Sequence, residues 1–361
     1  MADNILGFDT VAIDEENRAL VIIDQTKLPG RVEFLSLTKQ EDIHRAIRSL
    51  QVRGAPAIGV AAAAGVYLAA LGTDCADYDT FLAKFRESKE YLAASRPTAV
   101  NLFWALDRME RVVTDNSGAD VAEIKRLLRL EALAIRGADR AVCRAIGEYA
   151  LSLIRDGDGI LTHCNAGQLA AVRYGTALAP IYIGLERGLR FRVYADETRP
   201  LLQGARLTCF ELAALGVETT LICDGMASSV MQKGLVDAVF VGCDRVAANG
   251  DVCNKIGTSG AAIIARHYGV PFYVCAPTST IDMSSGSGAD IPIEERPPDE
   301  VTEMWYRERM APEGIGVYNP AFDVTENGLV TAVITERGIA RPPYSDTLRR
   351  IFSDSGAPVF L

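Results

Sequence analysis

The stretch ILTHCNAG, residues 160–167, sets the pattern for the second half of the chain. It is a short apolar run that ends in a polar loop containing glycine. Four later stretches repeat this pattern, each followed by a helical segment. Short apolar runs alternating with helices predict a parallel β-sheet covered on both faces. The predicted strands are residues 160–162, 191–195, 220–223, 238–241 and 272–276.

The loops after these strands are the first places to look for function, because open α/β sheets bind ligands beyond the carboxyl ends of their strands. All four of the loops that follow the first four strands are polar or rich in glycine. They comprise His163–Gly167, Asp196–Pro200, Asp224–Ala227 and Gly242–Arg245.

The first half of the chain is mostly helical. A β-branched run at 20–23 predicts a short sheet, and the spacing of apolar residues predicts helices over 38–50, from 58 onward, over 82–92 and over 102–113. At about 150 residues per domain, a chain of 361 residues should form two domains. We place a small, mainly helical domain with a short sheet at 1–135 and the larger α/β domain at 136–361.

Composition excludes several classes of protein. The 37 basic and 47 acidic residues give a net charge of −10, which argues against nucleic acid or a membrane surface as the main partner. The acidic N-terminal residues do not resemble a secretory signal. The alanine-rich run 60–71 is too short to span a bilayer and predicts a buried helix.

Cysteine and histidine usage favours a cytoplasmic protein without a structural metal. The eight cysteines form no C-x-x-C pair, which indicates reduced thiols. The three histidines, His44, His163 and His267, are far apart and show no zinc-binding spacing.

Nucleotide-binding and esterase fingerprints are absent after the predicted strands, so the sheet should bind another ligand. Basic side chains near backbone amides at helix starts form sites for a single phosphate group. The candidates are Arg53 with the amides of Gly54 and Ala55, Arg96, the predicted helix start at Gly204, and Asn254–Lys255 with Gly257.

Cys164 and Asp244 are the residues best placed for chemistry. Cys164 follows the first strand and precedes a predicted helix start, where the helix dipole would favour a thiolate. The alternative is a buried, inert cysteine. Asp244 follows the fourth strand, where an apolar setting would keep a carboxyl group protonated as an acid. Its alternative role is to cap the loop. His163 points away from its neighbour on an extended chain, so we predict a structural role for it.

Seven motifs occur in order along nearly the whole chain. Together they resemble the motif set of the S-methyl-5-thioribose-1-phosphate isomerase family, whose wider superfamily includes ribose-1,5-bisphosphate isomerases and regulatory subunits of a translation-initiation nucleotide exchange factor. The motifs are RGAPAIG (53–59), RPTAVNL (96–102), THCNAG (162–167), ETRP (197–200), LQGARLT (202–208), GCDRVAANGD (242–251) and NKIGT (254–258).

The resemblance implies a Rossmann-like C-terminal domain, a homodimer, a site between the domains and an aldose–ketose isomerisation in methionine salvage that needs no cofactor. It assigns chemistry to Cys164 and Asp244. It assigns substrate contacts to Arg53, Gly54, Ala55, Arg96, Gln203, Asn254 and Lys255.

The same resemblance implies a mechanism. An acid opens the ring of a sugar phosphorylated at its anomeric oxygen, and hydrogen then moves from C2 to C1 as a proton or a hydride. Gln168, Val172 and Arg173 depart from the small residues usual after the cysteine motif, which leaves the group at C5 open. The alternatives are isomerisation of 5-deoxyribose 1-phosphate or ribose 1,5-bisphosphate, and a non-catalytic sensor of sugar phosphates or nucleotides on the same fold.

Overall fold

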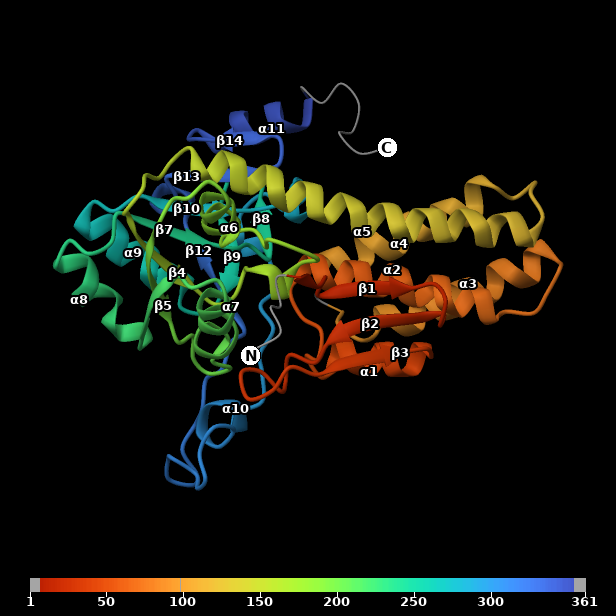
Figure 1. Cartoon of the computed structure of the whole chain (residues 1–361), viewed down its shortest axis with the longest axis horizontal. Helices are drawn as coiled ribbons and strands as arrows, with labels where there is room; N and C mark the ends of the chain where they lie inside the picture. Colours follow the sequence, from red (N-terminus) through yellow and green to blue (C-terminus); the bar gives the residue numbers. More distant parts are fainter. Residues whose placement is uncertain (1–6, 98, 354–361) are drawn as a thin grey trace. The chain divides into compact units, whose positions relative to one another are not determined.

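The computed structural model describes residues 7–97 and 99–353 of the chain (Figure 1). The chain divides into two compact units. Unit 1 comprises the described residues up to Arg144 together with Ala166–Gly175. Unit 2 comprises Ala145–Asn165 and the described residues from Thr176 onward.

Unit 1 contains a three-stranded antiparallel sheet and a set of helices, as the sequence predicts. Its strands are β1 (Val11–Asp14), β2 (Ala19–Ile23) and β3 (Phe34–Leu37). Its helices are α1 (Gln40–Arg48), α2 (Ala55–Gly72), α3 (Tyr78–Ala93), α4 (Val100–Asp115) and α5 (Val121–Leu151), the last of which continues into unit 2.

Helix α2 forms the centre of the unit 1 core. Alanines on several sides of this helix are fully buried, since their small side chains let neighbouring helices approach closely. Among the described residues, α2 is the one helix long and apolar enough to cross a membrane, and 72% of it is buried inside the protein. The burial confirms the prediction of a buried helix in this region.

Residues 166–175 belong to unit 1 although unit 2 residues flank them in the sequence. The amide of Thr10 donates to the carbonyl of Val172 at 3.1 Å, and the amide of Val172 donates to the Asp139 carboxylate at 2.6 Å. The side chain of Gln25 donates to the carbonyl of Leu169 at 2.7 Å. These bonds join parts of the chain that are distant in sequence. A single boundary drawn from local sequence, such as ours at residue 135, therefore cannot show that residues 166–175 return to unit 1.

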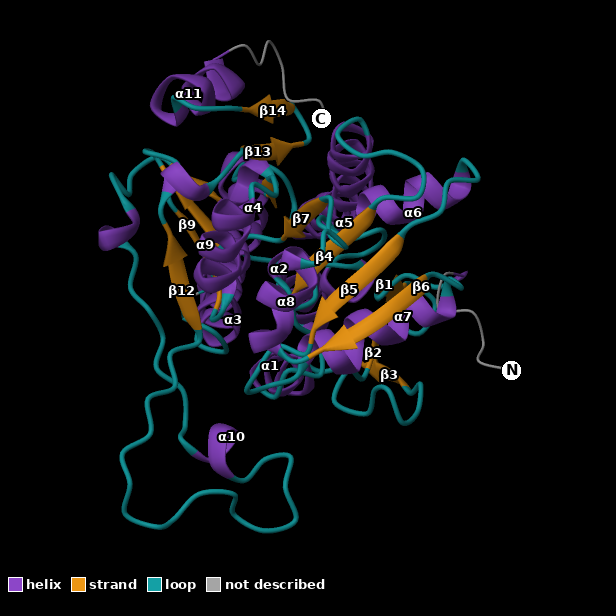
Figure 2. Cartoon of the chain, turned by 90° about the vertical axis from the view of Figure 1, so that its left-hand side faces the viewer, coloured by secondary structure: helices purple, strands orange, loops and turns teal. Residues whose placement is uncertain are grey.

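Unit 2 is built on a seven-stranded sheet of order β14-β13-β10-β7-β4-β5-β6 (Figure 2). All neighbouring strands are parallel except β13 and β14, so the predicted fold class is confirmed. The strands are β4 (Gly159–His163), β5 (Arg192–Asp196), β6 (Glu218–Ile222), β7 (Ala238–Val241), β10 (Phe272–Cys275), β13 (Ala332–Thr335) and β14 (Gly338–Ala340).

The helices of unit 2 are mostly short and alternate with the strands. Besides the end of α5 they are α6 (Ala179–Glu186), α7 (Cys209–Ala214), α8 (Ala227–Gln232), α9 (Thr258–Tyr268), α10 (Asp299–Thr302) and α11 (Tyr344–Ser353). The five strands that the sequence predicts coincide with β4, β5, β6, β7 and β10 to within two residues at either end.

A second sheet in unit 2 escaped sequence analysis. Its order is β11-β8-β9-β12, formed by β8 (Arg245–Ala247), β9 (Val252–Lys255), β11 (Ile281–Asp282) and β12 (Phe322–Thr325). These strands are two to four residues long and carry polar side chains, so they give no strong apolar pattern. Asn254 and Lys255 therefore lie on a strand rather than at a helix start.

The Ser- and Gly-rich patch 284–288 is hydrogen-bonded to the loop between β8 and β9 of the second sheet. The amide of Ala248 donates to the carbonyl of Ser285 at 2.9 Å, and the amide of Gly288 donates to Asp251 at 3.0 Å. The long loop that carries α10 follows and extends away from the sheets of unit 2 (Figure 2). Hydrogen bonds therefore hold the patch in place.

Candidate active site

Cys164 lies just beyond the carboxyl end of β4, with its backbone in the left-handed region at φ 64°. This conformation is uncommon for a residue with a β-carbon and persists only where its surroundings hold it. Two threonines do so. The amide of Cys164 donates to Oγ1 of Thr198 at 2.8 Å, and Oγ1 of Thr208 donates to the carbonyl of Cys164 at 2.6 Å. The cysteine is thus fixed on both sides and is partly exposed.

The prediction that a helix starts just after Cys164, with a dipole that favours the thiolate, is wrong. The chain after it forms only a three-residue 3₁₀ turn, Gln168–Ala170, which belongs to unit 1. Such a turn has no aligned series of peptide dipoles comparable to that of an α-helix. Any activation of the thiol must come from charged neighbours instead.

The loop after β5 supplies the support for Cys164. Thr198 also has a left-handed backbone, and its amide and that of Arg199 donate to the two oxygens of Asp224 at 2.7 and 2.8 Å. The predicted helix start at Gly204 is a π-helical segment, Gly204–Thr208. Such segments are rare and occur often at functional sites.

Gln203 lies directly before this π-helical segment and is 8% exposed. Its Oε1 atom is buried without a hydrogen-bond partner. Buried polar atoms in native proteins almost always find a partner, so an orphaned acceptor marks a position for a ligand donor such as a sugar hydroxyl.

Asp244 follows β7 and is half-buried. Its amide donates to the carbonyl of Cys253 at 3.1 Å. Burial raises the pKa of Cys253 to about 12 and that of Cys243 well above its usual value. These two thiols stay protonated at neutral pH, which leaves them unsuited to act as bases.

Lys255, at the end of β9, is 6% exposed. Burial lowers the pKa of its ammonium group, although the charges of Cys164 and Asp244 act in the opposite direction. Its Nζ lies 6.0 Å from the centre of the Phe322 ring, and among the described residues it has no hydrogen bond or ion pair. The structure therefore brings Lys255, Cys164 and Asp244 into one electrostatic group and leaves this buried cation available for an anion.

The amide of Gly257, which the sequence suggested as part of a phosphate site, is already occupied. It donates to Asp323 at 2.8 Å, and the amide of Ser259 donates to the same carboxylate at 3.1 Å. Asp323 thus caps the start of α9. Asn254 lies beside this cap, with its side-chain amide donating to Oγ1 of Thr258 at 3.0 Å.

The remaining predicted contacts lie in unit 1. Gly54 precedes α2 at φ 92°, and a β-carbon on it would lie 2.5 Å from Cα of Ala170, so only glycine fits there. Arg53 beside it is 8% exposed, and Ala55 begins α2. Arg96 lies in the turn between α3 and α4, whose Thr98 is outside the described residues.

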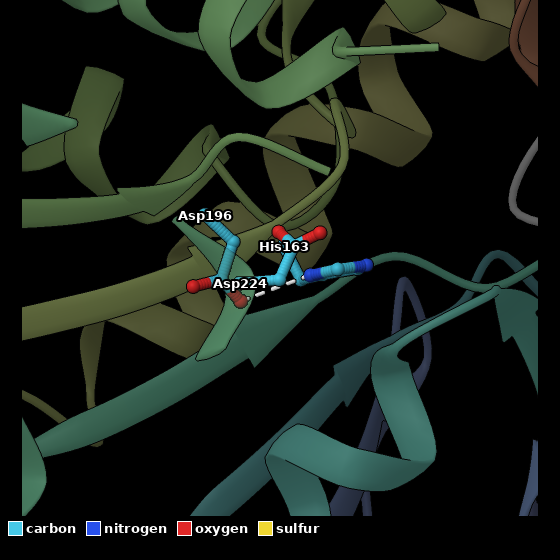
Figure 3. A group of neighbouring side chains, drawn as sticks. All are labelled: His163, Asp196 and Asp224. Atoms are coloured by element: carbon cyan, nitrogen blue, oxygen red, sulfur yellow. Dashed lines mark hydrogen bonds and ion pairs between the residues drawn. The ribbon is translucent and has the colours of Figure 1, made fainter. Parts of the chain in front are cut away.

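The structure also brings together three polar side chains that the sequence analysis did not predict to act together. His163, Asp196 and Asp224 each have a polar atom within 4.8 Å of those of the other two (Figure 3). Such a trio could in principle hold a metal ion. However, both ring nitrogens of His163 are hydrogen-bonded, and both oxygens of Asp224 accept backbone N–H groups. Hydrogen bonds within the protein thus occupy most of the cluster's polar atoms, and Oδ1 of Asp196 is buried without a hydrogen-bond partner.

Comparison with known proteins identifies the family. The profile of the Initiation factor 2 subunit family matches residues 51–342, which is most of the chain. The chain belongs to this family.

The relatives by sequence carry the names of sugar-phosphate isomerases. The chain is 65% identical to the methylthioribose-1-phosphate isomerase of Symbiobacterium thermophilum, over 95% of this chain and 96% of that protein. It is 54% identical to the 5-deoxyribose 1-phosphate isomerase of Petrotoga mobilis, over 95% of this chain and 98% of that protein.

Structural comparison agrees. The crystal structure of 5-methylthioribose 1-phosphate isomerase from Pyrococcus horikoshii superposes with a TM-score of 0.91 at 42% identity. The match covers 98% of this chain and 99% of that one. The chain thus shares its architecture with that isomerase over 98% of its length.

Proposed function

We propose that the protein is an aldose–ketose isomerase that converts S-methyl-5-thioribose 1-phosphate into S-methyl-5-thioribulose 1-phosphate. The observation that carries the proposal is the 65% identity, over nearly the whole chain, to a protein named methylthioribose-1-phosphate isomerase. The grouping of Cys164, Asp244 and Lys255 in unit 2 supports it. Isomerisation conserves atoms and electrons, so the reaction needs no external oxidant or reductant.

In this proposal, Asp244 opens the sugar ring. A phosphate on the anomeric oxygen prevents spontaneous opening, so the ring oxygen must be protonated as its bond to C1 breaks. A carboxyl group held half-buried at the end of β7 is suited to deliver that proton. The hydroxyl group at C2 loses a proton when the ketone forms, so one proton is gained at the ring oxygen and one is lost from C2–OH.

Cys164 acts at the step that moves hydrogen from C2 to C1. If hydrogen moves as a proton, the thiolate removes it from C2 and returns it to C1. If it moves as a hydride, the sulfur stabilises the positive charge that develops on the sugar. In both routes the clamped backbone of Cys164 fixes the sulfur, and the Lys255 ammonium favours the thiolate.

The substrate contacts are Lys255, Gln203 and Asn254 in unit 2 and Arg53, Gly54, Ala55 and Arg96 in unit 1. The Lys255 ammonium, which makes no hydrogen bond or ion pair among the described residues, would give a strong, charge-assisted contact to a phosphate oxygen. The unpaired Oε1 of Gln203 suits a sugar hydroxyl.

A second candidate substrate is 5-deoxyribose 1-phosphate, because two relatives with that name are 54% and 55% identical to this chain. The side chain of Gln168 donates to the backbone carbonyl of Phe8 at 2.8 Å, and Arg173 pairs with Asp9. Both side chains thus contact the N-terminal part of unit 1, which argues against a role for them in binding a polar group at C5.

We also retain a homodimer and a cytoplasmic location as proposals. The dimer rests on the family resemblance, and light scattering of the purified protein tests it. The location rests on the eight cysteines, none of which forms a disulfide in the structure.

The decisive experiment is a substrate panel. Purified protein is incubated with ribose 1-phosphates that carry methylthio, hydrogen, hydroxyl or phosphate at C5, and ketose product is measured by NMR. The proposal expects the highest kcat/KM for the methylthio compound. Preference for the 5-deoxy compound would favour the second candidate, and the absence of ketose from every compound would favour a sensor.

Two substitutions test the assigned chemistry. Asp244→Asn should fold and bind substrate but lose at least about 100-fold in kcat, the usual contribution of a general acid. Cys164→Ser should lose most activity, and substrate should slow alkylation of Cys164 in the wild type. Near-normal turnover by either variant would refute its assignment.

A further inference from the structure

The hydrogen bonds of His163 define its protonation. Its Nε2 lies 2.8 Å from the carbonyl oxygen of Ile256, and its Nδ1 lies 2.9 Å from Oδ2 of Asp196. Because a carbonyl oxygen only accepts hydrogen bonds, Nε2 carries a proton. The second contact needs one more proton. The pair is therefore either an imidazolium with a carboxylate or a neutral imidazole with a carboxylic acid.

The surroundings of the ring favour the imidazolium. The titratable groups facing it are Asp196 on β5, Asp224 after β6 and Asp323 on β12, all carboxyl groups, while Lys255 lies on β9 one residue before Ile256. Backbone N–H groups donate to the carboxyl oxygens of both Asp224 and Asp323. Burial alone would lower the pKa of His163, but Asp196, Asp224 and the bond to Ile256 raise it above its ordinary value. Burial also raises the pKa of Asp196, against the lowering effect of its bond to His163, so the choice of the imidazolium rests on the three carboxyl groups that surround the ring.

His163 also connects the two segments that carry the proposed chemistry. It directly precedes Cys164 in the chain, and its partner Ile256 directly follows Lys255. The ring packs closely on this second segment, since a β-carbon on Gly257 would lie 2.7 Å from Cε1 of His163. A shift of the ring would therefore move the segments of both residues.

We infer that His163 is a positioning residue that remains an imidazolium ion at neutral and mildly alkaline pH and holds the Cys164 loop against the end of β9 that bears Lys255. Its positive charge, one residue from Cys164, also favours the thiolate. The inference deepens the proposed function and rests on it for its catalytic consequence. The protonation state itself is a property of the free protein.

Loss of the ring proton would release this connection. Nε2 would still donate to the carbonyl of Ile256, so the proton would leave Nδ1. The lone pair of Nδ1 would then face Oδ2 of the Asp196 carboxylate, and two hydrogen-bond acceptors would repel each other. Because the pKa of His163 is raised in the folded protein, the connection is intact below that pKa and is lost as the pH rises through it.

The first test uses NMR on the free, full-length protein labelled with ¹⁵N in its three histidines. Signals are assigned with His44→Gln and His267→Gln, which remove one residue each. The inference expects both nitrogens of His163 to be protonated from pH 6 to pH 8. A neutral ring with a single proton at pH 7 would overturn it, because the proton would then lie on Asp196. This test needs no substrate and stands whatever reaction the protein catalyses.

The second test uses Asp196→Asn, with Asp237→Asn as its matched control. Asp237 accepts the amide of Gly159 at 2.7 Å at the opposite end of β4, so it probes a carboxylate bound to the same strand. Asp196→Asn should lower the pKa of His163, move the alkaline loss of kcat/KM to lower pH and reduce kcat at least tenfold. The control should leave the pH profile unchanged.

Alkylation of Cys164, mapped by mass spectrometry, gives a readout without turnover. At pH 7 it should slow at least fivefold in Asp196→Asn, because the neighbouring positive charge is lost. An unchanged alkylation rate, or an unchanged alkaline limb in a variant whose circular dichroism matches the wild type, would overturn the positioning role. If Asp196→Asn does not fold, the NMR measurement on the wild type still decides the inference.

Discussion

Replacing Lys255 with methionine should make the protein more stable and less able to bind its substrate. Lys255 is 6% exposed, and its ammonium has neither a hydrogen bond nor an ion pair among the described residues. Methionine keeps much of the side-chain volume and removes the charge. The variant therefore separates the cost of burying this cation from its use in binding.

The stability gain follows from burial. Replacing a buried ion pair by apolar side chains of similar size is often neutral or stabilising by about 1–4 kcal/mol, because desolvating the charges costs more than their attraction returns. The Phe322 ring and the charges of Cys164 and Asp244 offset part of the cost, so we expect the low end, about 1 kcal/mol. For a unit of 150–250 residues this corresponds to a rise in Tm of about 2–4 °C.

The gain should depend on pH in a defined direction. Burial lowers the pKa of Lys255 in the folded protein below its unfolded value. The folded state therefore carries its full penalty below the folded pKa, and the penalty disappears as the pH rises through the unfolded value near 10.5. The difference in Tm between Lys255→Met and the wild type should shrink as the pH rises toward that value.

Binding should change in the opposite direction. A charge-assisted contact to phosphate contributes about 1.5–3 kcal/mol, so substrate affinity should fall by about 10- to 150-fold. Differential scanning fluorimetry and isothermal titration calorimetry give the two quantities. Lys233→Met, at an exposed position in the same unit, serves as the control and should change neither. A Lys255→Met variant that is less stable than the wild type, or that binds substrate equally well, would refute the reasoning.

Three further variants test other parts of the structure. Thr198→Val should cost about 1–3 kcal/mol in urea unfolding and lower kcat, because the amide of Cys164 loses its acceptor, whereas Thr198→Ser should behave like the wild type. Asp139→Asn should stabilise the protein above pH 7 by up to about 4 kcal/mol, because burial raises the pKa of Asp139 from 3.8 to about 7. The gain in stability should decrease as the pH falls, so the difference in Tm between variant and wild type should be smaller at pH 5 than at pH 8. Gln203→Leu should raise KM at least about tenfold without loss of Tm, because it removes a buried acceptor that has no partner in the protein; an unchanged KM would count against a substrate contact there.

The sequence by itself determined the parallel sheet and the helices of unit 1. Strands β4, β5, β7 and β10 are buried along most of their length, so their sequences are continuous apolar runs between glycine loops. Helix α2 was predicted for the same reason, since its alanines and valines leave no polar face. These patterns involve residues that are close together in the chain, so they can be recognised in a single sequence.

The sequence also located Cys164 and Asp244 at strand ends, because the carboxyl edge of a parallel sheet is where ligands bind. It did not foresee how Cys164 is held. The helix expected after it is a 3₁₀ turn in unit 1, and the residue is fixed instead by hydroxyl groups of Thr198 and Thr208, 34 and 44 positions away. Nothing in the local sequence encodes those partners.

Only the tertiary structure decided three other features. It placed Asn254 and Lys255 on a strand of the second sheet, whose short polar strands depend on one another for their hydrogen bonds. It assigned residues 166–175 to unit 1 through bonds to Thr10, Gln25 and Asp139. It joined His163 to Asp196 and to Ile256, 93 positions away. A buried polar group needs a hydrogen-bond partner, and the folded chain can supply that partner from any position in the sequence. Local sequence patterns therefore do not identify it.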